Sequence, residues 1–251
     1  MTPLLRLRAV AKSYGAVEAL RGVDLDVAAG DVLALCGDNG AGKSTLVKIL
    51  SGAHAPDSGA IEFDGAPVRF ASPQDALTRG IATIYQELAV APRLSVAENV
   101  FLGSELVRAP FGLPFPSLLD KRRMRNEALG YLERLGIAIG DAGRPVERLS
   151  GGQRQAVAIA RALRWNARVV IMDEPTAALG VAETALVLGL VRRLAAEGRT
   201  VVLVSHSMAD VAAVATRVAI LKGGRKAIDR PAAGLDPAAL ARMVITGREA
   251  A

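Results

Sequence analysis

The fold is decided by the stretch VLALCGDNGAGKS, which runs from Val32 to Ser44. Its apolar start predicts a short buried strand, and its glycine-rich end leads into a helix from about Gly42 to Leu50. Between them, residues 37–44 fit the pattern G-x-x-x-x-G-K-[ST], after a strand and before a helix as that pattern requires. In that geometry backbone N–H groups bind phosphates, Lys43 neutralises the outer ones and Ser44 places its hydroxyl on Mg²⁺. We therefore predict a nucleotide-binding loop formed by Gly37, Asp38, Asn39, Gly40, Ala41, Gly42, Lys43, Ser44 and Thr45.

The composition has the balance of a soluble globular protein. The chain has 251 residues, which suits one large domain or a domain with an inserted lobe, and 51% of them are hydrophobic. The single cysteine, Cys36, allows no disulfide within one chain and favours a reducing compartment. Because Cys36 lies in the apolar run VLALC, we interpret it as a core residue. No stretch approaches the roughly 18 apolar residues of a membrane span, and the N-terminus lacks a signal-peptide core, so we expect neither a membrane-spanning nor an exported subunit.

The net charge of +6 permits contact with nucleic acid, but the basic residues are scattered. Their densest cluster, KRRMR at residues 121–125, precedes NEALGYLERLG and predicts the solvated face of an amphipathic helix. Contact with an acidic protein surface or with anionic lipid headgroups is the alternative for this cluster. We expect no nucleic-acid partner.

The first part of the chain predicts antiparallel strands. The runs LLRLRAV and KSYGAVEALRGVDLDV, between Leu4 and Val27, alternate like strands joined by turns. A hairpin turn is expected at Asp64-Gly65, and Ser72-Pro73 predicts a helix start, with an N-cap followed by proline. The run IATIYQ predicts a further strand that ends at Gln86.

The remainder predicts a helical lobe followed by alternating strands and helices. From about Leu88 to Leu149 the pattern is helical, broken by the proline-rich run APFGLPFP at residues 109–116, which predicts an irregular loop. The later expected elements are helices over 151–165 and 181–196, strands over 168–172 and 200–204, a hairpin turn at Gly223-Gly224 and a closing helix capped by Asp236-Pro237.

This order of elements indicates an α/β fold with a mainly parallel sheet covered on both faces. An N-terminal antiparallel β part and an inserted α-helical part are added to it. We expect a single domain over residues 1–251, in which about 1–87 and 150–251 form the core. Residues 88–149 begin the helical part, which extends through the following helix to about 165.

Two carboxylates stand where a parallel sheet presents its ligands. The strand VVIM delivers Asp173 and Glu174 at its C-terminal end, where Asp173 can hold Mg²⁺ and Glu174 can orient and deprotonate an attacking water. A solvated turn is the alternative. His206 follows the strand TVVLVS in the same way, so we predict a γ-phosphate contact for it rather than a satisfied loop histidine.

Two further residues complete the candidate site. Gln86 can touch the metal or the water when the helical lobe approaches, and release it when the lobe moves away. Tyr14, in KSYG, can stack on the base, although a tyrosine in a turn is common. We expect His54, in the loop GAHAPDSG, to be simply exposed.

The stretch LSGGQRQ, from Leu149 to Gln155, predicts a second phosphate-binding helix start, because a hydroxyl and two glycines precede a helical run. One nucleotide has only one triphosphate, so a second such start requires an explanation. A helix N-terminus contributes roughly 0.3–1 kcal/mol to an anion, which is too little to capture a nucleotide by itself.

Together, Tyr14, GDNGAGKST, YQE, LSGGQ, VVIMDE and His206 resemble the aromatic loop, Walker A, Q-loop, signature, Walker B and H-loop of the ABC transporter ATPases. The resemblance covers nearly the whole chain and implies a P-loop NTPase that hydrolyses ATP with Mg²⁺ held by Ser44, Gln86 and Asp173. In that family two ATPase domains pair head to tail, and each signature closes over the nucleotide of the other. This implies an ATP-dependent homodimer in which the partner's nucleotide is contacted by Ser150, Gly151, Gly152 and Gln153.

Longer stretches, including YQELAVAPRLSVAENVFLG, are similar to the bacterial monosaccharide importers of the ribose, xylose and fructose type. That similarity implies an ATPase at the cytoplasmic face of the inner membrane, docked on integral permease subunits that an extracytoplasmic solute-binding protein supplies. The alternatives are an ABC ATPase for another solute, a soluble ABC protein of DNA repair or translation, and a regulatory nucleotide-binding module. Gly180 replaces the family's usual aspartate, which puts coupling between the two sites in question. Import rather than export rests on resemblance, and we expect no residue of this chain to touch the cargo.

Overall fold

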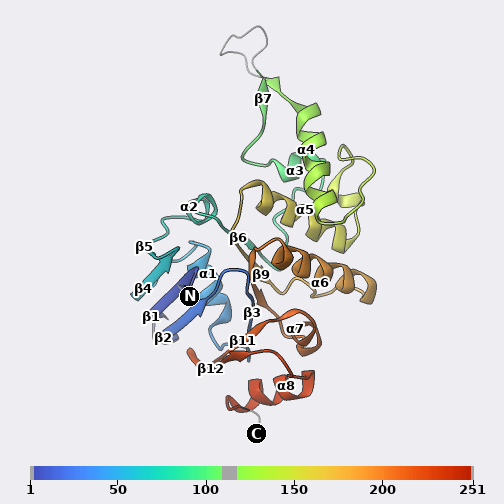
Figure 1. Cartoon of the computed structure of the whole chain (residues 1–251). Coiled ribbons are helices and arrows are strands. Elements are labelled where there is room, and N and C mark those ends of the chain that lie inside the picture. Colours follow the sequence, from blue (N-terminus) through green and yellow to red (C-terminus); the bar gives the residue numbers. More distant parts are fainter. Residues whose placement is uncertain (1–2, 109–117, 250–251) are drawn as a thin grey trace.

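The computed structural model describes residues 3–108 and 118–249 of the chain. The predicted irregular loop at 109–116 lies outside these residues. Figure 1 shows the antiparallel strands on one side of the central sheet, α6 and α7 on the other side, and the helices α3 to α5 gathered beyond one edge.

The central sheet has six strands in the order β12-β11-β3-β10-β9-β6, and only β12 is antiparallel to its neighbour. The prediction of a mainly parallel sheet is therefore confirmed. Its strands are β3 (Val32–Gly37), β6 (Ile81–Ile84), β9 (Val169–Asp173), β10 (Thr200–Val204), β11 (Arg217–Lys222) and β12 (Arg225–Pro231).

Both faces of this sheet are covered, which explains its continuous apolar runs. In β9, Val169 and Ile171 pack into the core that includes α1 and the antiparallel sheet, whereas Val170 and Met172 pack into the core that includes α5 and α6. Cys36 of β3 lies in a third core with α7 and α8, and its burial raises the pKa of the thiol to about 12. The interpretation of Cys36 as a core residue is confirmed.

The N-terminal part forms the predicted antiparallel sheet, in the order β2-β1-β4-β5. The turn between β4 and β5 falls at Asp64-Gly65 as expected, and both residues have positive φ values. The strands are β1 (Leu5–Tyr14), β2 (Val17–Val27), β4 (Ser58–Phe63) and β5 (Ala66–Val68).

Most helices around the sheet begin where the sequence indicates. The side chains of Ser72 and Asp236 accept the N-cap hydrogen bonds of α2 and α8, each of which has proline in its first turn. Helix α7 was not predicted; its seven residues follow an N-cap at Ser207. These helices are α1 (Lys43–Leu50), α2 (Pro73–Thr78), α6 (Val181–Ala196), α7 (Met208–Val214) and α8 (Pro237–Thr246).

The remaining helices form a lobe, and its core is continuous with the core under one face of the central sheet. Along α4, Met124, Ala128 and Leu132 are buried at four-residue spacing while Lys121 to Arg123 are exposed, which confirms the solvated face. The lobe's elements are α3 (Val96–Val100), α4 (Lys121–Arg134), the 3₁₀ turn η2 (Val146–Arg148), α5 (Gly151–Arg164) and the short strands β7 (Val107–Arg108) and β8 (Leu118–Leu119).

The expectation of a helical pattern from about 88 to 149, broken at 109–116, is wrong in part. Residues 88–95 and 135–145 form turns and extended segments. Proline and glycine explain the difference: Pro92 and Pro145 lack an N–H group, and Gly136 has a φ of 70° that helices do not contain. Among the described residues, no helix combines the length and apolarity needed to cross a bilayer.

Candidate active site

The phosphate loop leaves β3 at Gly37 and enters α1 at Lys43, and two of its glycines are required by close backbone contacts. A Cβ atom on Gly37, at φ 151°, would lie 2.3 Å from the Leu221 carbonyl oxygen. A Cβ atom on Gly42, at φ 105°, would lie 2.6 Å from the Ala19 carbonyl oxygen. The loop is therefore pressed against β11 and β2, and no side chain fits at either position.

Lys43 lies inside the loop, where it is only 6% exposed. Its Nζ atom donates hydrogen bonds to the carbonyl oxygens of Gly37, at 2.7 Å, and Asp38, at 3.0 Å. Burial lowers the pKa of the ammonium, and the charges of Glu174 and Asp173 are among those that oppose this shift. The ammonium is thus placed where phosphate oxygens can replace carbonyl oxygens as its acceptors.

The other predicted loop residues lie around this ammonium. Asp38, Asn39 and Gly40 are exposed at the bend, whereas Ala41 is buried. Ser44 and Thr45 lie in the first turn of α1, and Ser44 is exposed. The N-cap of α1 is Gly42, which has no side chain to accept a bond from the first-turn N–H groups. The geometry leaves these groups to an external anion.

The carboxylates at the end of β9 lie beside the loop. Burial and the neighbouring charge of Glu174 raise the pKa of Asp173, and the charges of Lys43 and His206 counteract this shift. Glu174 has a φ of 51°, an unusual value for a residue with a side chain, and its N–H donates to the Val204 carbonyl oxygen at 2.9 Å. This bond to β10 fixes the strained residue at the edge of the sheet.

His206 follows β10, and its Nε2 atom lies 2.7 Å from Oε1 of Glu174. The structure therefore brings these two side chains together. His206 also lines a cavity of about 280 Å³ with Gly37 to Asn39, and a second cavity of about 290 Å³ with Glu174 and Thr176. It thus stands between the phosphate loop and the candidate base.

Sequence reasoning missed the polar contacts that support Glu174. The hydroxyl of Thr176 donates to Oδ2 of Asp210 at 2.7 Å, which ties the segment after Glu174 to α7. Ser205 accepts a hydrogen bond from the N–H of Ser207 at 3.0 Å. Recognition of Ser207-Met208-Ala209-Asp210 as a capped helix start was the available signal, because the Ser207 hydroxyl accepts the N–H of Asp210.

Gln86 lies in an exposed bend two residues after β6, which ends at Ile84 and not at Gln86 as predicted. The preceding residue, Tyr85, lines a cavity of about 350 Å³ between the sheet and the helical lobe, together with Ala89 and Arg161. Arg161 of α5 donates to the Ala89 carbonyl oxygen at 2.8 Å. The segment around Gln86 is thereby attached to the helix that begins with the signature residues.

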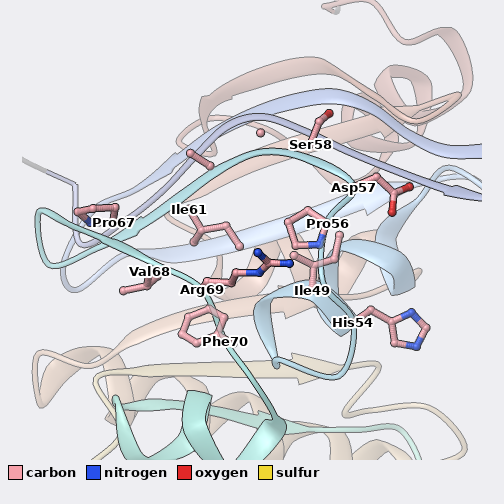
Figure 2. Close-up of a pocket in the computed structure, with 12 residues that line it drawn as sticks. Ile49, His54, Pro56, Asp57, Ser58, Ile61, Pro67, Val68, Arg69 and Phe70 are labelled. Carbon is pink, nitrogen blue, oxygen red and sulfur yellow. The ribbon is translucent and has the colours of Figure 1, made fainter.

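Tyr14 ends β1 with 41% of its surface exposed. Its hydroxyl lies 2.8 Å from Nδ1 of His54, and the two rings meet edge to face with centroids 5.7 Å apart. The expectation that His54 is simply exposed is wrong, because the loop after α1 brings it half-buried against Tyr14. Figure 2 shows His54 and Asp57 at one end of a separate cavity, of about 400 Å³, that also contains the Arg69 guanidinium.

The predicted signature residues begin α5 with a reciprocal cap. The Ser150 hydroxyl accepts from the N–H of Gln153 at 3.3 Å, and the N–H of Ser150 donates to Oε1 of Gln153 at 3.1 Å. The N–H of Gly151 donates to the Glu183 carboxylate at 2.8 Å. Gly152 is buried against α6, where a Cβ atom would lie 3.2 Å from Leu186. These contacts join the signature to α6 of its own chain.

One hydrogen bond links the signature helix to the candidate base. Gln155 is 4% exposed, and its Nε2 atom donates to the Pro175 carbonyl oxygen at 2.9 Å. Pro175 follows Glu174 directly. The start of α5 and the end of β9 therefore hold a fixed relation within one chain.

Comparison with known proteins identifies a matching family model, described as ABC transporter, over residues 20–177. The chain is 48% identical to the xylose/arabinose import ATP-binding protein of Sulfolobus acidocaldarius, over 90% of this chain and 87% of that protein. It is also 48% identical to the fructose import ATP-binding protein of Rhizobium meliloti, over 89% and 86%. A ribose import ATP-binding protein of Rubrobacter xylanophilus is 44% identical over 97% of this chain, which spans 46% of that relative.

Solved structures of ABC transporter cassettes also match the chain. The chain matches the ADP conformation of an ATP-binding cassette of an ABC transporter with a TM-score of 0.81, at 25% identity over 98% of this chain and 96% of that one. A dimeric bacterial ABC transporter cassette matches with a TM-score of 0.74, at 28% identity over 92% and 100%. The chain belongs to the ABC transporter family, and it is an ATPase built on that family's nucleotide-binding cassette.

Proposed function

We propose that this ATPase energises the uptake of a monosaccharide through partner permease subunits in the membrane. The xylose/arabinose and fructose import relatives, at 48% identity over most of their length, support the sugar class. The contact between Glu174 and His206 is the observation that supports a cassette that hydrolyses ATP over one that only binds it for regulation. This contact orients a carboxylate beside the phosphate loop. In this proposal residues 1–87 and 150–251 form the core, and residues 88–149 begin the helical part.

Residues 37–45 bind the phosphates of ATP, and Tyr14 stacks on the base. Lys43 exchanges its carbonyl acceptors for oxygens of the outer phosphates and stabilises the charge that develops there. His54 holds the hydroxyl of Tyr14 and so fixes the plane of the stacking ring. These contacts orient the nucleotide along the end of α1.

The residues at this edge of the sheet fit Mg²⁺. The pKa of Asp173 is raised by burial and by the charge of Glu174, and such a pair of carboxylates is stabilised by a nearby cation. With Asp173, the hydroxyl of Ser44 and the amide of Gln86 would complete the protein's share of the Mg²⁺ ligands, because magnesium prefers oxygen ligands. When bound, Mg²⁺ neutralises charge on the phosphate oxygens.

Glu174 orients the attacking water and accepts its proton. His206 keeps the carboxylate of Glu174 directed at the water and contacts the γ-phosphate. Thr176 and Asp210 hold the segment after Glu174 in place, so that its unusual backbone conformation persists through the reaction.

Two copies pair head to tail, so that Ser150, Gly151, Gly152 and Gln153 of each copy contact the nucleotide of the other. The cis contacts of these residues with α6, rather than with the phosphate loop of their own chain, support this arrangement. A solved dimeric cassette of similar fold supports it as well. An isologous pairing fills both sites at once, so ATP closes the dimer and hydrolysis opens it.

The proposed location is the cytoplasmic face of the inner membrane, where the chain is a peripheral subunit. A permease segment docks in a groove, the cavity of about 350 Å³ that Tyr85 lines. The walls of the groove include Leu77, Leu102 and Trp165. Leu102 is 39% exposed there. Because Arg161 ties this groove to α5, docking and movement of the signature are mechanically linked. A solute-binding protein outside the membrane delivers the sugar.

A hydrolysis-deficient variant tests the ATPase mechanism. Glu174→Gln keeps the size of the side chain but removes the base, so we expect ATP binding to persist while turnover falls roughly 10²–10⁴-fold. The variant should accumulate as an ATP-bound dimer on size exclusion. Glu127→Gln, which removes a charge from the exposed face of α4, is the matched control and should hydrolyse normally. Normal turnover by Glu174→Gln contradicts the assigned role.

Affinity capture of the tagged chain from its native membrane tests the physiological role. We expect a permease and a sugar-binding protein to be recovered together, and sugars to stimulate ATP hydrolysis by the reconstituted complex. Recovery of a permease for a different solute would replace the sugar class. Recovery of nucleic acid in place of any permease would contradict transport.

A further inference from the structure

The N-terminus of the signature helix α5 already has an anion bound to it from the same chain. Glu183 lies in the first turn of α6, and its Oε1 atom accepts the N–H of Gly151 at 2.8 Å. A Cβ atom on Gly151 would lie 3.2 and 3.3 Å from the two carboxylate oxygens, so the whole carboxylate rests against the start of the helix.

The surroundings of this carboxylate consist of hydrogen-bond donors. The N–H of Gly151 makes the largest contribution that lowers the pKa of Glu183, partial burial opposes it, and the N–H groups of Gly180 and Gly152 and the hydroxyl of Ser150 lower it further. Among the ion pairs of the described residues, none includes Glu183. The positive end of α5 therefore serves as its counter-charge.

The same donors are those that the partner's nucleotide requires in the proposed dimer. The N–H of Gln153 is occupied by the Ser150 hydroxyl, and the N–H of Gly151 by Glu183. A terminal phosphate that arrives at this helix start meets a carboxylate of the same sign within a few ångströms, where like charges repel strongly. Phosphate and carboxylate cannot both hold the Gly151 N–H.

We propose that Glu183 is an autoinhibitory placeholder, whose carboxylate occupies the position at the start of α5 that the partner's nucleotide phosphate takes when two copies pair. This inference rests on the proposed trans use of the signature. The carboxylate stabilises the signature turn in the unpaired chain and raises the ATP concentration needed for pairing. On closure it releases Gly151 and turns toward solvent; after hydrolysis it returns and assists separation.

The position of Gly180 fits this role. Gly180 precedes α6 as its N-cap and has no carboxylate of its own, and its N–H is among the groups that lower the pKa of Glu183. Glu183, the first acidic residue after Glu174, thus lies against the signature of its own chain.

Charge removal at Glu183 tests the placeholder. Glu183→Gln retains an oxygen that can accept the Gly151 N–H but removes the negative charge. In a Glu174→Gln background, we expect the dissociation constant of the ATP-bound dimer to be about tenfold lower for the double variant at low salt, which corresponds to about 1.4 kcal/mol for the whole dimer. The dimer dissociation constant is measured by analytical ultracentrifugation at saturating ATP. Glu127→Gln in the same background is the charge-matched control and should leave this constant unchanged.

Two further measurements separate this inference from the proposed pairing. The tenfold difference should shrink at 1 M salt, because salt screens a charge repulsion but not a loss of packing. In the unpaired chain, the NMR amide resonance of Gly151 should move as the Glu183 carboxylate is protonated, and should lose this movement in Glu183→Gln.

Each outcome has a consequence. Unchanged or weaker pairing of the double variant, while Glu174→Gln alone still dimerises with ATP, overturns the placeholder and leaves the proposed function standing. Failure of both variants to dimerise with ATP overturns the trans pairing and the placeholder together. If the double variant dimerises with ATP and Glu174→Gln does not, the placeholder is supported in its strongest form.

Discussion

The starts of α1 and α5 are both built from glycine, a hydroxyl and main-chain N–H donors, yet the fold treats them differently. Gly42 caps α1 with no side-chain acceptor, and the ammonium of Lys43 stands beside its first turn. The start of α5 is closed by Ser150 and by the carboxylate of Glu183. The start of α1 is open and carries a positive charge, so it can bind a phosphate by itself. The start of α5 already binds the Glu183 carboxylate, so a phosphate can bind there only by displacing that carboxylate.

The largest expected effect comes from filling the glycine positions of the two helix starts. Gly42→Ala places a methyl group against the Ala19 carbonyl at a φ of 105°, and we expect it to cost roughly 3 kcal/mol of unfolding free energy and to abolish ATP binding. Gly151→Ala meets the tip of Leu179 at 2.5 Å and the Glu183 carboxylate oxygens at 3.2 and 3.3 Å, and because both are ends of flexible side chains, roughly 1 kcal/mol is expected. Urea denaturation measures both. Equal losses would remove the structural distinction between the two starts.

The functional distinction is tested by Lys43→Met and Ser150→Ala. Loss of the ammonium removes charge-assisted hydrogen bonds and should weaken ATP binding by the unpaired chain by about 1.5–3 kcal/mol. Ser150→Ala should leave that affinity unchanged but prevent ATP-dependent pairing in the Glu174→Gln background, and it costs about 1 kcal/mol of stability through the lost cap. Fluorescent-nucleotide titration of dilute protein, followed by size exclusion, separates the two effects. A Ser150→Ala chain that binds ATP poorly when unpaired contradicts the division between cis and trans.

A smaller effect is expected at the far end of α1, where His54 supports Tyr14. His54→Ala removes one hydrogen bond to the stacking ring and should weaken ATP binding by about 1 kcal/mol. Tyr14→Phe, which keeps the ring and loses the same bond, is the matched variant and should behave alike. Binding of inorganic triphosphate measures the phosphate loop alone and should be unaffected by either. An equal loss for triphosphate would show that His54 acts on the loop itself.

The smallest expected effect is the acid sensitivity of the start of α5. The pKa of Glu183 is lowered in the folded chain, chiefly by the Gly151 N–H, so its stabilising contribution is present above the ordinary glutamate pKa of about 4.3. It is lost as the pH falls through the lower pKa of the folded state. The urea midpoint of the native chain should therefore exceed that of Glu183→Gln at pH 7, and the two should converge as the pH falls through the lowered pKa of Glu183 in the folded chain. A difference that does not change with pH would place the effect of the substitution elsewhere.

The fold follows from the sequence because its signals are local. The apolar run before Gly37, the cap at Ser72-Pro73 and the turn at Asp64-Gly65 each act within a few residues, and the strands and helices formed where these signals stand. Prediction was poorest between 88 and 149, where apolar periodicity continues through segments that proline and glycine keep out of helix. It also missed α7, whose seven residues carry too short a pattern to be distinguished from a loop.

The sequence by itself determined the phosphate loop, the carboxylates after β9 and the motif order, because each depends on residues that are neighbours in the chain or end neighbouring parallel strands. Only the tertiary structure decided which partners these groups find: His206 on Glu174, His54 on Tyr14, and Glu183 on Gly151. Each of these contacts joins elements that are far apart in sequence. Their geometry depends on how the sheet, α1 and α6 pack, and a one-dimensional pattern does not encode hydrogen-bond distances across such packing.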